Sequence, residues 1–370
     1  MNDESLQLAR VAVAVGQRLN SRLFLGAMER CGGFEGFFRE SDRAIQALFD
    51  RPGDEELPLA RKGWLEEAER ELRFMQREGV CCCDVFSPRY PSLLGQCADA
   101  PLVIFYKGTL EATGEKALGV VGTRKASERC KARVELLLKE IAEMRYAPVV
   151  VSGLAYGIDA AAHQAALAYG LVTRAVMGHG LHTVYPASHK QLSERIIAQG
   201  GCLMSEYSSR ATVLPVNFLQ RNRLVAGMSN ALLVAESAVK GGAMSTARRA
   251  FEYNREVLAF PGRPEDALSA GCNFLIKMNV ASLATETEDV LRALGWEARV
   301  ATAFQTSLDL FAEPEREGKI VTTLREQGEM HVDQLSVLAG IPVAELTPLL
   351  LKMELEGVVM PLPGNRFALC

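Results

Sequence analysis

The residues of this sequence that could do chemistry are cations placed beside glycines. Arg124 follows Gly122 in VVGTRKAS, and Lys240 precedes Gly242 and Thr246 in KGGAMST. In both stretches an apolar run ends near glycine, which lets a ligand approach the backbone, and a helical pattern then presents free N–H groups to an anion. The Thr246 hydroxyl can donate a further hydrogen bond. Both stretches predict phosphate contacts, although a tight turn with a solvated arginine is the alternative for the first.

A third group of cations lies in FLQRNRLVAG. Arg221 and Arg223 flank Asn222, and Phe218 stands three residues before Arg221. Charged side chains are rarely buried without a partner, so either an acid of the protein or an anionic ligand must meet them. An aromatic ring among cations is the composition used for single-stranded nucleic acid, where the ring stacks on a base. Phe218 is therefore either a base platform or a core residue, and the residues alone leave both open.

The residue patterns that could support catalysis or metal binding are less specific. Asp159 and His163 share a helix face downstream of Ser152, but the GxSxG elbow is absent, so we expect a structural pair. Three histidines fall in GHGLHTVYPASHK without a companion cysteine or acidic cluster, so no metal site is predicted. The GxxxxGK-S/T and GxGxxG spacings are also absent. We therefore predict no catalytic residues and no cofactor.

Predicted strands position these cations. Short apolar runs alternate with helical patterns between about residues 100 and 295, namely PLVIFYKG, ALGVVGTR, APVVVSGLAYG, VTRAVMGHG, GGCLMSEY, NALLVAES and REVLAFPG. Strands that are apolar throughout and alternate with helices indicate a parallel sheet covered on both faces. We predict an α/β, doubly wound domain over residues 81–296, whose ligand binds at the carboxyl ends of the strands. Strand ends would then supply Arg124, Arg221, Arg223 and Lys240.

Two other segments flank this domain. Residues 1–80 show helical patterns, with Ser41 suited to a helix start and Gly79 to a helix stop. Within them GAMERCGGFEGFF resembles helix-hairpin-helix or sterile-alpha-motif modules, and a plain helical packing domain is the alternative. Residues 297–317 lack a clear period and are predicted to be a linker. Residues 318–370 carry three helical patterns and two short strands around a PGN turn, which predicts a winged helix.

The composition limits the classes of function. The 370 residues carry a net charge of −4, so any anion site must be a local concentration of charge. The nine cysteines lack zinc-like spacing and are expected to be reduced, buried thiols in a reducing cytoplasm. MNDESLQLAR lacks the features of a secretion signal, and no run of about 18 uncharged apolar residues exists. We therefore predict a cytoplasmic protein without a membrane span.

Taken together, these motifs resemble the bacterial DNA-processing proteins of the DprA/Smf family. The matching segments follow the family order across roughly residues 85–290: YPSLLGQCADAPLVIFYKG, VVGTR, SGLAYGIDAAAH, GLHTVYP, FLQRNRLVAG, KGGAMST, and AFPG followed by SAGCNFLI. The resemblance implies an extended Rossmann-like fold that dimerises and binds single-stranded DNA cooperatively, without strong sequence preference. It further implies loading of the RecA recombinase during natural transformation, and no catalysis. The implied DNA contacts are Gly122, Arg124, Phe218, Arg221, Asn222, Arg223, Gly242 and Thr246, to which the cationic turn adds Lys240.

The sequence departs from the family pattern at several positions. His182 and His189 stand where the family usually has Asp and Asn, which leaves the polarity of that loop open. Gly241 and Ala243 stand where serine is common, so hydroxyl contacts would be fewer. Asn279 replaces a common glycine, and asparagine tolerates a positive φ better than other residues.

Two other functions fit parts of the sequence. Rossmann-like nucleotide hydrolases of the lysine-decarboxylase-like group use a PGGxGTxxE turn with a catalytic Glu, but here Arg248 and Arg249 stand where that Glu would be needed. Winged helices also occur in transcription factors, yet the presumed recognition helix PVAELTPLLLKMELEG holds one Lys and three Glu. That charge is poor for reading a major groove. We expect the winged helix to contact protein or to modulate the dimer.

Overall fold

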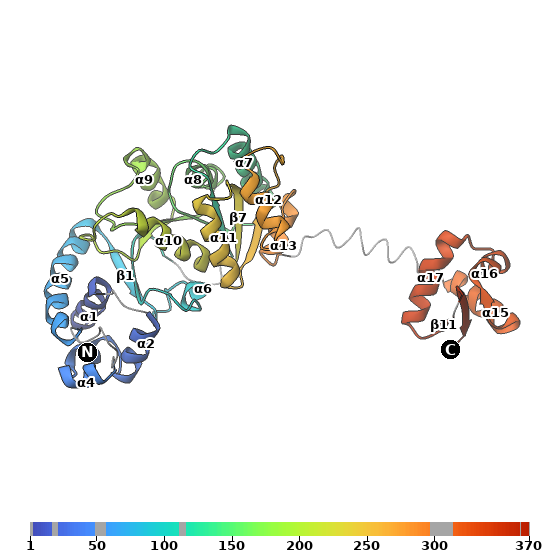
Figure 1. Cartoon of the computed structure of the whole chain (residues 1–370), viewed down its shortest axis with the longest axis horizontal. Coiled ribbons are helices and arrows are strands. Elements are labelled where there is room, and N and C mark those ends of the chain that lie inside the picture. The colour runs from blue at the N-terminus through green and yellow to red at the C-terminus, as the bar shows by residue number, and fades with distance from the viewer. Residues whose placement is uncertain are drawn as a thin grey trace. The chain divides into compact units, whose positions relative to one another are not determined.

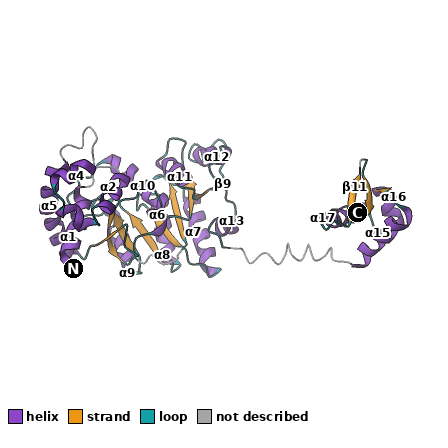
Figure 2. Cartoon of the chain, turned by 90° about the horizontal axis from the view of Figure 1, so that it is seen from below, coloured by secondary structure: helices purple, strands orange, loops and turns teal. Residues whose placement is uncertain are grey.

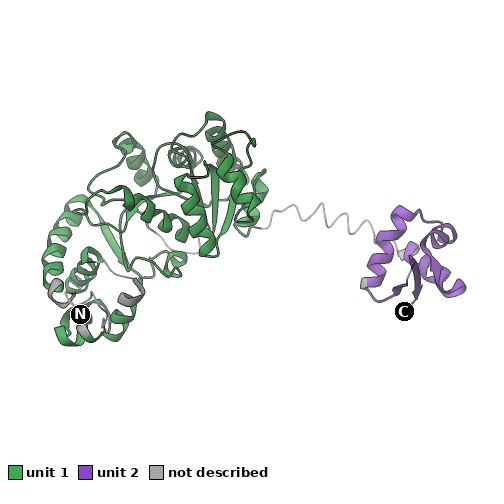
Figure 3. Cartoon of the chain, in the orientation of Figure 1, with its two compact units in different colours: residues 1–296 green, residues 297–370 purple. Residues whose placement is uncertain are grey.

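The computed structural model describes residues 3–16, 21–48, 57–110, 116–296, 314–362 and 364–369. The chain forms two compact units, residues 1–296 and 297–370 (Figure 3). The first unit holds a helical N-terminal segment and a large sheet, and the second is a small unit of helices and strands. Most of the predicted linker, residues 297–313, lies outside the described residues.

A nine-stranded sheet forms the centre of the first unit, in the order β1-β2-β6-β5-β4-β3-β7-β8-β9 (Figure 1). The strands are β1 (Cys81–Asp84), β2 (Val103–Gly108), β3 (Ala117–Gly122), β4 (Val149–Ser152), β5 (Thr173–Val176), β6 (Cys202–Ser205), β7 (Ala231–Glu236), β8 (Glu256–Ala259) and β9 (Ser282–Leu283). Strands β3 to β9 are parallel, whereas β1 and β2 add an antiparallel edge. The predicted α/β fold class is confirmed. Strands β1 and β9 are additional to the predicted ones, because β9 has only two residues and β1 (CCCD) is a run of cysteines that ends in a charge.

Helices cover both faces of the sheet, as apolar strands require (Figure 2). One face carries α7 (Glu128–Glu143), α8 (Ile158–Ala168) and α13 (Thr287–Ala293), and the other carries α10 (Pro215–Met228), α11 (Gly242–Glu252) and α12 (Ala270–Lys277). Successive residues of β3 point to opposite faces, so Val120 belongs to one core and Val121 to the other.

The order of the strands reverses at β3. Strand β4 lies on one side of β3 and β7 lies on the other. In open α/β sheets such a switch point leaves a crevice at the carboxyl ends of the strands, where ligands bind. By this rule the expected ligand site lies between the loop that follows Gly122 and the loop that follows Glu236.

The N-terminal helices pack on one edge of the sheet. They are α1 (Asp3–Gly16), α2 (Ser21–Arg30), α3 (Phe34–Arg39), α4 (Asp42–Leu48) and α5 (Leu57–Glu78). Ser41 caps α4 by accepting a hydrogen bond from Ala44 N, and Gly79, with φ of 65°, ends α5. Phe37 of α3 shares a core with Phe105 of β2, so the helices and the sheet form one packed body. Assignment of these helices to a helix-hairpin-helix or sterile-alpha-motif module stays a prediction.

The second unit is a winged helix, as predicted. It contains α15 (Pro314–Gln327), α16 (Val332–Ala339), α17 (Val343–Leu355), and a sheet of β10 (Met330–His331), β12 (Arg366–Leu369) and β11 (Val359–Leu362). Leu335 and Leu346 lie in its own core. No single described helix is long and apolar enough to cross a membrane. Helices α16 and α17 reach the length and apolar composition of a span only when they are taken together, and they are bent by 105° relative to each other.

None of the eight described cysteines is in a disulfide bond, and most are buried. Burial raises the pKa of Cys82, Cys83, Cys130 and Cys272 to about 12. These thiols therefore stay protonated and unreactive at neutral pH. Cys81 is the exposed exception among the described ones, on the edge strand β1.

Candidate nucleic-acid interface

The segment FLQRNRLVAG lies in helix α10. This helix begins at Pro215, a residue suited to the first helical turn. The prediction that Arg221 and Arg223 lie at strand ends is therefore wrong. Residues five positions apart on a helix point about 140° apart, so Phe218 and Arg223 face different surroundings.

Phe218 lies half-buried on α10, beside Gly178, which follows β5. Its ring centroid lies 5.5 Å from that of Tyr185 and 6.2 Å from that of His179. The exposed Arg124 places its guanidinium carbon 5.9 Å from the same centroid, which is a cation–π distance. Asn222, one turn further along, is also half-buried. The structure thus brings together two predicted site residues, Arg124 and Phe218, and leaves the ring partly open to solvent.

Arg221 points into the protein. Its side chain is 3% exposed, and Nη1 donates a hydrogen bond to the carbonyl oxygen of Val176, the last residue of β5. Burial lowers the pKa of Arg221, and the carboxyl group of Asp159 opposes that shift. Burial likewise raises the pKa of Asp159, against the Arg221 charge. An internal acid therefore meets this cation, and the structure presents no exposed guanidinium for the DNA contact predicted at Arg221.

Arg223 also has acidic partners inside the chain. Its Nη2 forms an ion pair with Glu206 Oε2, and its Nε lies 4.0 Å from Asp99 Oδ2. Burial raises the pKa of Glu206, and the Arg223 charge opposes this. Glu206 follows β6 and Asp99 follows α6 (Ser92–Gly95), so neither acid is near Arg223 in the sequence. This separation is why the residue spacing indicated no compensating acid.

The N-terminus of α7, predicted to receive a phosphate, already holds a carboxylate. Ser127 caps this helix, and its N and Oγ each donate a hydrogen bond of 2.7 Å to a carboxylate oxygen of Glu236. Glu236 is buried, and its carbonyl oxygen accepts a bond of 2.7 Å from Thr123 N. An acid of the chain thus occupies the positive end of the helix. The expectation of a free anion site at this helix start is therefore wrong, and the loop keeps Arg124 and the adjacent Lys125 as exposed cations.

The two predicted site glycines have different surroundings. A Cβ at Gly122 would collide with Ile158, so internal packing already requires a glycine there. Gly242 is exposed at the start of α11, and a Cβ there would meet nothing within 4 Å. Lys240 is exposed in the same loop, whereas Thr246 lies on the buried face of α11. The loop therefore offers the Gly242 backbone and the Lys240 amine to a ligand, but it does not offer the Thr246 hydroxyl.

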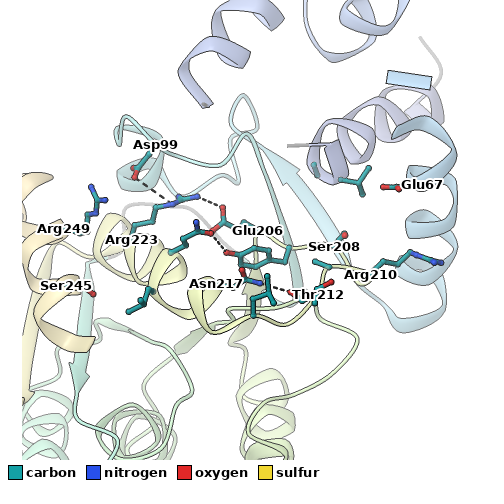
Figure 4. Close-up of a pocket in the computed structure, with 17 residues that line it drawn as sticks. Glu67, Asp99, Glu206, Ser208, Arg210, Thr212, Asn217, Arg223, Ser245 and Arg249 are labelled. Atoms are coloured by element: carbon teal, nitrogen blue, oxygen red, sulfur yellow. Dashed lines mark hydrogen bonds and ion pairs between the residues drawn. The ribbon is translucent and has the colours of Figure 1, made fainter. Parts of the chain in front are cut away.

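An open groove of about 1080 Å³ lies on the Arg223 side of α10 (Figure 4). It runs between α10 and the N-terminal helices, and α11 contributes Ser245 and Arg249. Its charged lining residues are Arg210, Arg223, Arg249, Glu67, Asp99 and Glu206, which balance one another. The groove was not predictable from the sequence, because its walls come from widely separated segments.

Ser152, Asp159 and His163 do not form a catalytic triad. Ser152 Oγ donates to Val120 O at 2.6 Å, and His163 Nδ1 lies 2.6 Å from Thr173 Oγ1. Burial lowers the pKa of His163 from 6.5 to about 3, so the ring is neutral at pH 7. His163 has the structural surroundings that we expected, with Thr173 as its hydrogen-bond partner instead of Asp159.

The histidine loop also makes structural contacts. His179 and His189 each place Nδ1 at 2.9 Å from a backbone carbonyl oxygen, and His182 is exposed. Within the described ranges, no group of three or more His, Cys, Asp or Glu residues is arranged to hold a metal ion. Asn279 adopts a φ of 53°, which confirms that this position needs a residue tolerant of positive φ.

Sequence comparisons identify relatives for both units. The family described as DNA recombination-mediator protein A matches residues 82–295, and the DprA winged helix domain matches residues 307–365. Protein Smf of Escherichia coli is 36% identical over 282 residues, which cover 75% of this chain and 74% of that protein. DNA processing protein DprA of Streptococcus pneumoniae is 41% identical over 202 residues, covering 55% of this chain and 70% of that protein.

Solved structures agree with these matches. The X-ray structure of DNA processing protein A from Streptococcus pneumoniae has a TM-score of 0.65 and 30% identity, covering 79% of this chain and 98% of the solved one. A structure of DNA processing protein A from Helicobacter pylori, described for its single-stranded DNA binding mode, has a TM-score of 0.50 and 26% identity. It covers 58% of this chain and 95% of the solved one.

Proposed function

Because this chain belongs to the DprA/Smf family of DNA-processing proteins, we propose that it binds single-stranded DNA around Phe218 and Arg124. The observation that carries the proposal is the half-buried Phe218 ring with the exposed Arg124 guanidinium 5.9 Å from its centroid. The buried His179 contacts the ring from inside and the exposed Tyr185 lies beside it, so the open part of the ring offers a supported surface on which a base can stack. The neighbouring arginine is placed for the adjoining phosphate.

The DNA backbone would continue toward Lys240 and Gly242. Arg124 follows β3 and Lys240 follows β7, and these strands are neighbours in the sheet. The open space beside Gly242 supports a close approach of phosphate to the start of α11. Stacking and phosphate contacts do not depend on base identity, so we propose binding without strong sequence preference.

Other residues predicted as contacts have supporting roles in this proposal. Arg221 fixes α10 to the end of β5, and Arg223 fixes it to Glu206. Thr246 packs α11 onto the sheet, and Gly122 lets the Arg124 loop lie against α8. Asn222 stands beside Phe218 on the open side of the helix and is proposed as a DNA contact.

We propose that the protein acts as a homodimer that delivers DNA to a RecA-type recombinase during natural transformation. The family is described as a recombination mediator, which supports the proposed delivery of DNA to a recombinase. The proposed homodimer is supported by the exposed apolar side chains at the β9 edge of the sheet, which are Phe274, Met278 and Leu283. An open sheet edge beside apolar side chains favours association with another chain.

We propose that the protein binds DNA without catalysis. Ser152 and His163 form hydrogen bonds with Val120 and Thr173 instead of with each other, which supports this proposal. Arg248 and Arg249, which stand in place of a catalytic Glu, support it as well. The test is a gel shift with oligo-dT and with a duplex of equal length at two salt concentrations, alongside a nucleotide-hydrolysis assay. We expect tighter binding of the single strand, weakening with salt, and no hydrolysis. Equal affinity for both DNAs, or hydrolysis above that of a blank, would contradict the proposal.

A further inference from the structure

A carboxylate of the N-terminal helices is buried against the chain that leads into α10. Glu71 of α5 is 2% exposed. Its Oε1 accepts a hydrogen bond of 2.8 Å from Ser209 N, and its Oε2 accepts one of 2.6 Å from Ser209 Oγ. A carboxylate withdrawn from water needs such donors, so this side chain favours one position of Ser209.

Ser209 lies in residues 206–214, the approach segment, which joins β6 to α10. Side-chain contacts tie this segment to α10 at several points. Tyr207 OH lies 3.2 Å from Gln220 Oε1, Asn217 Nδ2 donates to Thr212 O at 2.9 Å, and Glu206 pairs with Arg223. Figure 4 shows Ser208, Arg210 and Thr212 of the segment between α10 and the side of α5 that carries Glu67. A shift of the approach segment would therefore move α10.

The other side of the approach segment packs on the loop that follows β5. A Cβ at Gly180 would collide with the backbone of Ser208 and Ser209. The neighbouring His179 accepts a hydrogen bond on its carbonyl oxygen from Ser205 Oγ at 2.7 Å, and its ring contacts Phe218. The approach segment is thus wedged between Glu71 and the loop that supports the Phe218 ring.

From this geometry we propose that Glu71 is a positioning residue of the DNA site. By holding Ser209 it fixes the approach segment, and through that segment it fixes α10 and the Phe218 ring. The N-terminal helices then control the affinity for single-stranded DNA without contacting it. The inference rests on the proposed function of the Phe218 site and adds a second element on which that site depends.

The direction in which Glu71→Gln changes the affinity for DNA distinguishes a positioning role of Glu71 from a purely electrostatic one. Glu71→Gln removes one negative charge, which by electrostatics alone would strengthen binding to DNA. Positioning predicts the opposite result, because the amide replaces one acceptor with a donor and releases Ser209. We expect the affinity for oligo-dT to fall by about tenfold, the effect of losing roughly one charge-assisted hydrogen bond. The slope against salt should stay unchanged, since no phosphate contact is lost. Ser209→Ala, which keeps the backbone donor, should give a smaller loss in the same direction.

Glu67→Gln is the matched control, because Glu67 is an exposed acid one turn earlier on α5 that lines the groove. It should bind oligo-dT at least as well as the wild type. Trypsin gives a readout independent of DNA, since Arg210 is exposed in the approach segment. Glu71→Gln should speed cleavage after Arg210, and Glu67→Gln should not. Unchanged cleavage, or unchanged or tighter binding, in Glu71→Gln overturns the inference. A wild-type protein that fails to bind oligo-dT would overturn the proposed function, and the cleavage rates would still decide whether Glu71 holds the segment.

Discussion

Phe218 is the residue on which the proposed DNA site depends most. Its ring is half-buried, so truncation to alanine would remove packing and stacking together. Phe218→Leu keeps an apolar side chain against Tyr185 and His179 but removes the aromatic face. Since stacking of a base on an aromatic ring is typically worth about 1–3 kcal/mol, we expect the affinity for oligo-dT to fall by roughly tenfold. The thermal midpoint should change little, which differential scanning fluorimetry can check. Phe86→Leu, at an exposed aromatic residue outside the site, serves as the control.

Substitution of Arg124 tests the electrostatic contribution to DNA binding at the same site. Its guanidinium is exposed and lies 5.9 Å from the Phe218 ring centroid. Arg124→Ala should weaken binding to oligo-dT and lower the slope of log K against log salt by about 0.7, the value for one contact to single-stranded DNA. Arg292→Ala removes the same charge from α13 and should leave both quantities near the wild-type values. An unchanged slope in Arg124→Ala would remove this residue from the proposed DNA contacts.

Single residues could be interpreted from the sequence only where their partners were close in the chain. The exposed Arg124 and Lys240 follow strand ends that the apolar runs revealed. Arg223 meets Glu206, and Ser127 meets Glu236, only after the sheet has formed. Such long-range acid partners leave no periodic signal in the sequence. Of the four cations predicted to contact DNA, only Arg124 and Lys240 are therefore exposed.

At the scale of elements, His163 joins α8 to β5 through Thr173 and makes the stability of this pair depend on pH. Burial lowers the pKa of His163 from 6.5 to about 3. Between these values the unfolded chain binds a proton at His163 and the folded chain does not, so the free energy of unfolding falls as pH falls, by about 1.4 kcal/mol per pH unit. We expect His163→Gln to lose this part of the pH dependence between pH 7 and pH 5, measured by urea unfolding.

The exposed His182 gives the control for that measurement. His182→Gln should keep the wild-type pH dependence, because it leaves the buried His163 and its contact with Thr173 in place. If His163→Gln and the wild type lose stability equally on going from pH 7 to pH 5, then His163 does not stay neutral in the folded chain.

The order of helices and strands along the chain was easier to predict from the sequence than the way these elements pack against one another. Apolar runs that alternate with helical patterns indicate β2 to β8 because these strands are buried on both faces. Strand β1 of the antiparallel edge was not predictable in the same way, since Cys81–Asp84 is only partly buried and ends in a charge. Helix α10 was placed at strand ends because its cations come just before an apolar run. The helical spacing of its buried residues, Leu224, Val225 and Met228, shows the helix once the sheet supplies the surface they face.

At the scale of the whole molecule, the two units have separate cores and separate charge patterns. The winged helix buries Leu335, Leu346 and Leu349 without help from the first unit. Several of its cations are matched by its own acids: Lys352 lies 2.7 Å from Glu317, Arg316 lies 2.7 Å from Glu345, and Arg366 lies 3.1 Å from Glu329. Cations paired in this way offer little to a phosphate backbone, which agrees with the expectation that this unit contacts protein.

A chain that ends at Trp296 should therefore keep the DNA site intact. The first unit has its own cores on both sheet faces, and all the proposed DNA contacts lie in it. We expect the truncated chain to bind oligo-dT within roughly twofold of the full chain, with the same salt slope, since independent domains retain their own contacts. Residues 314–370 alone should not shift oligo-dT at the same concentrations. A tenfold loss on truncation, with a lower salt slope, would instead place phosphate contacts in the winged helix. A loss with an unchanged slope would point to its influence on assembly of the first unit.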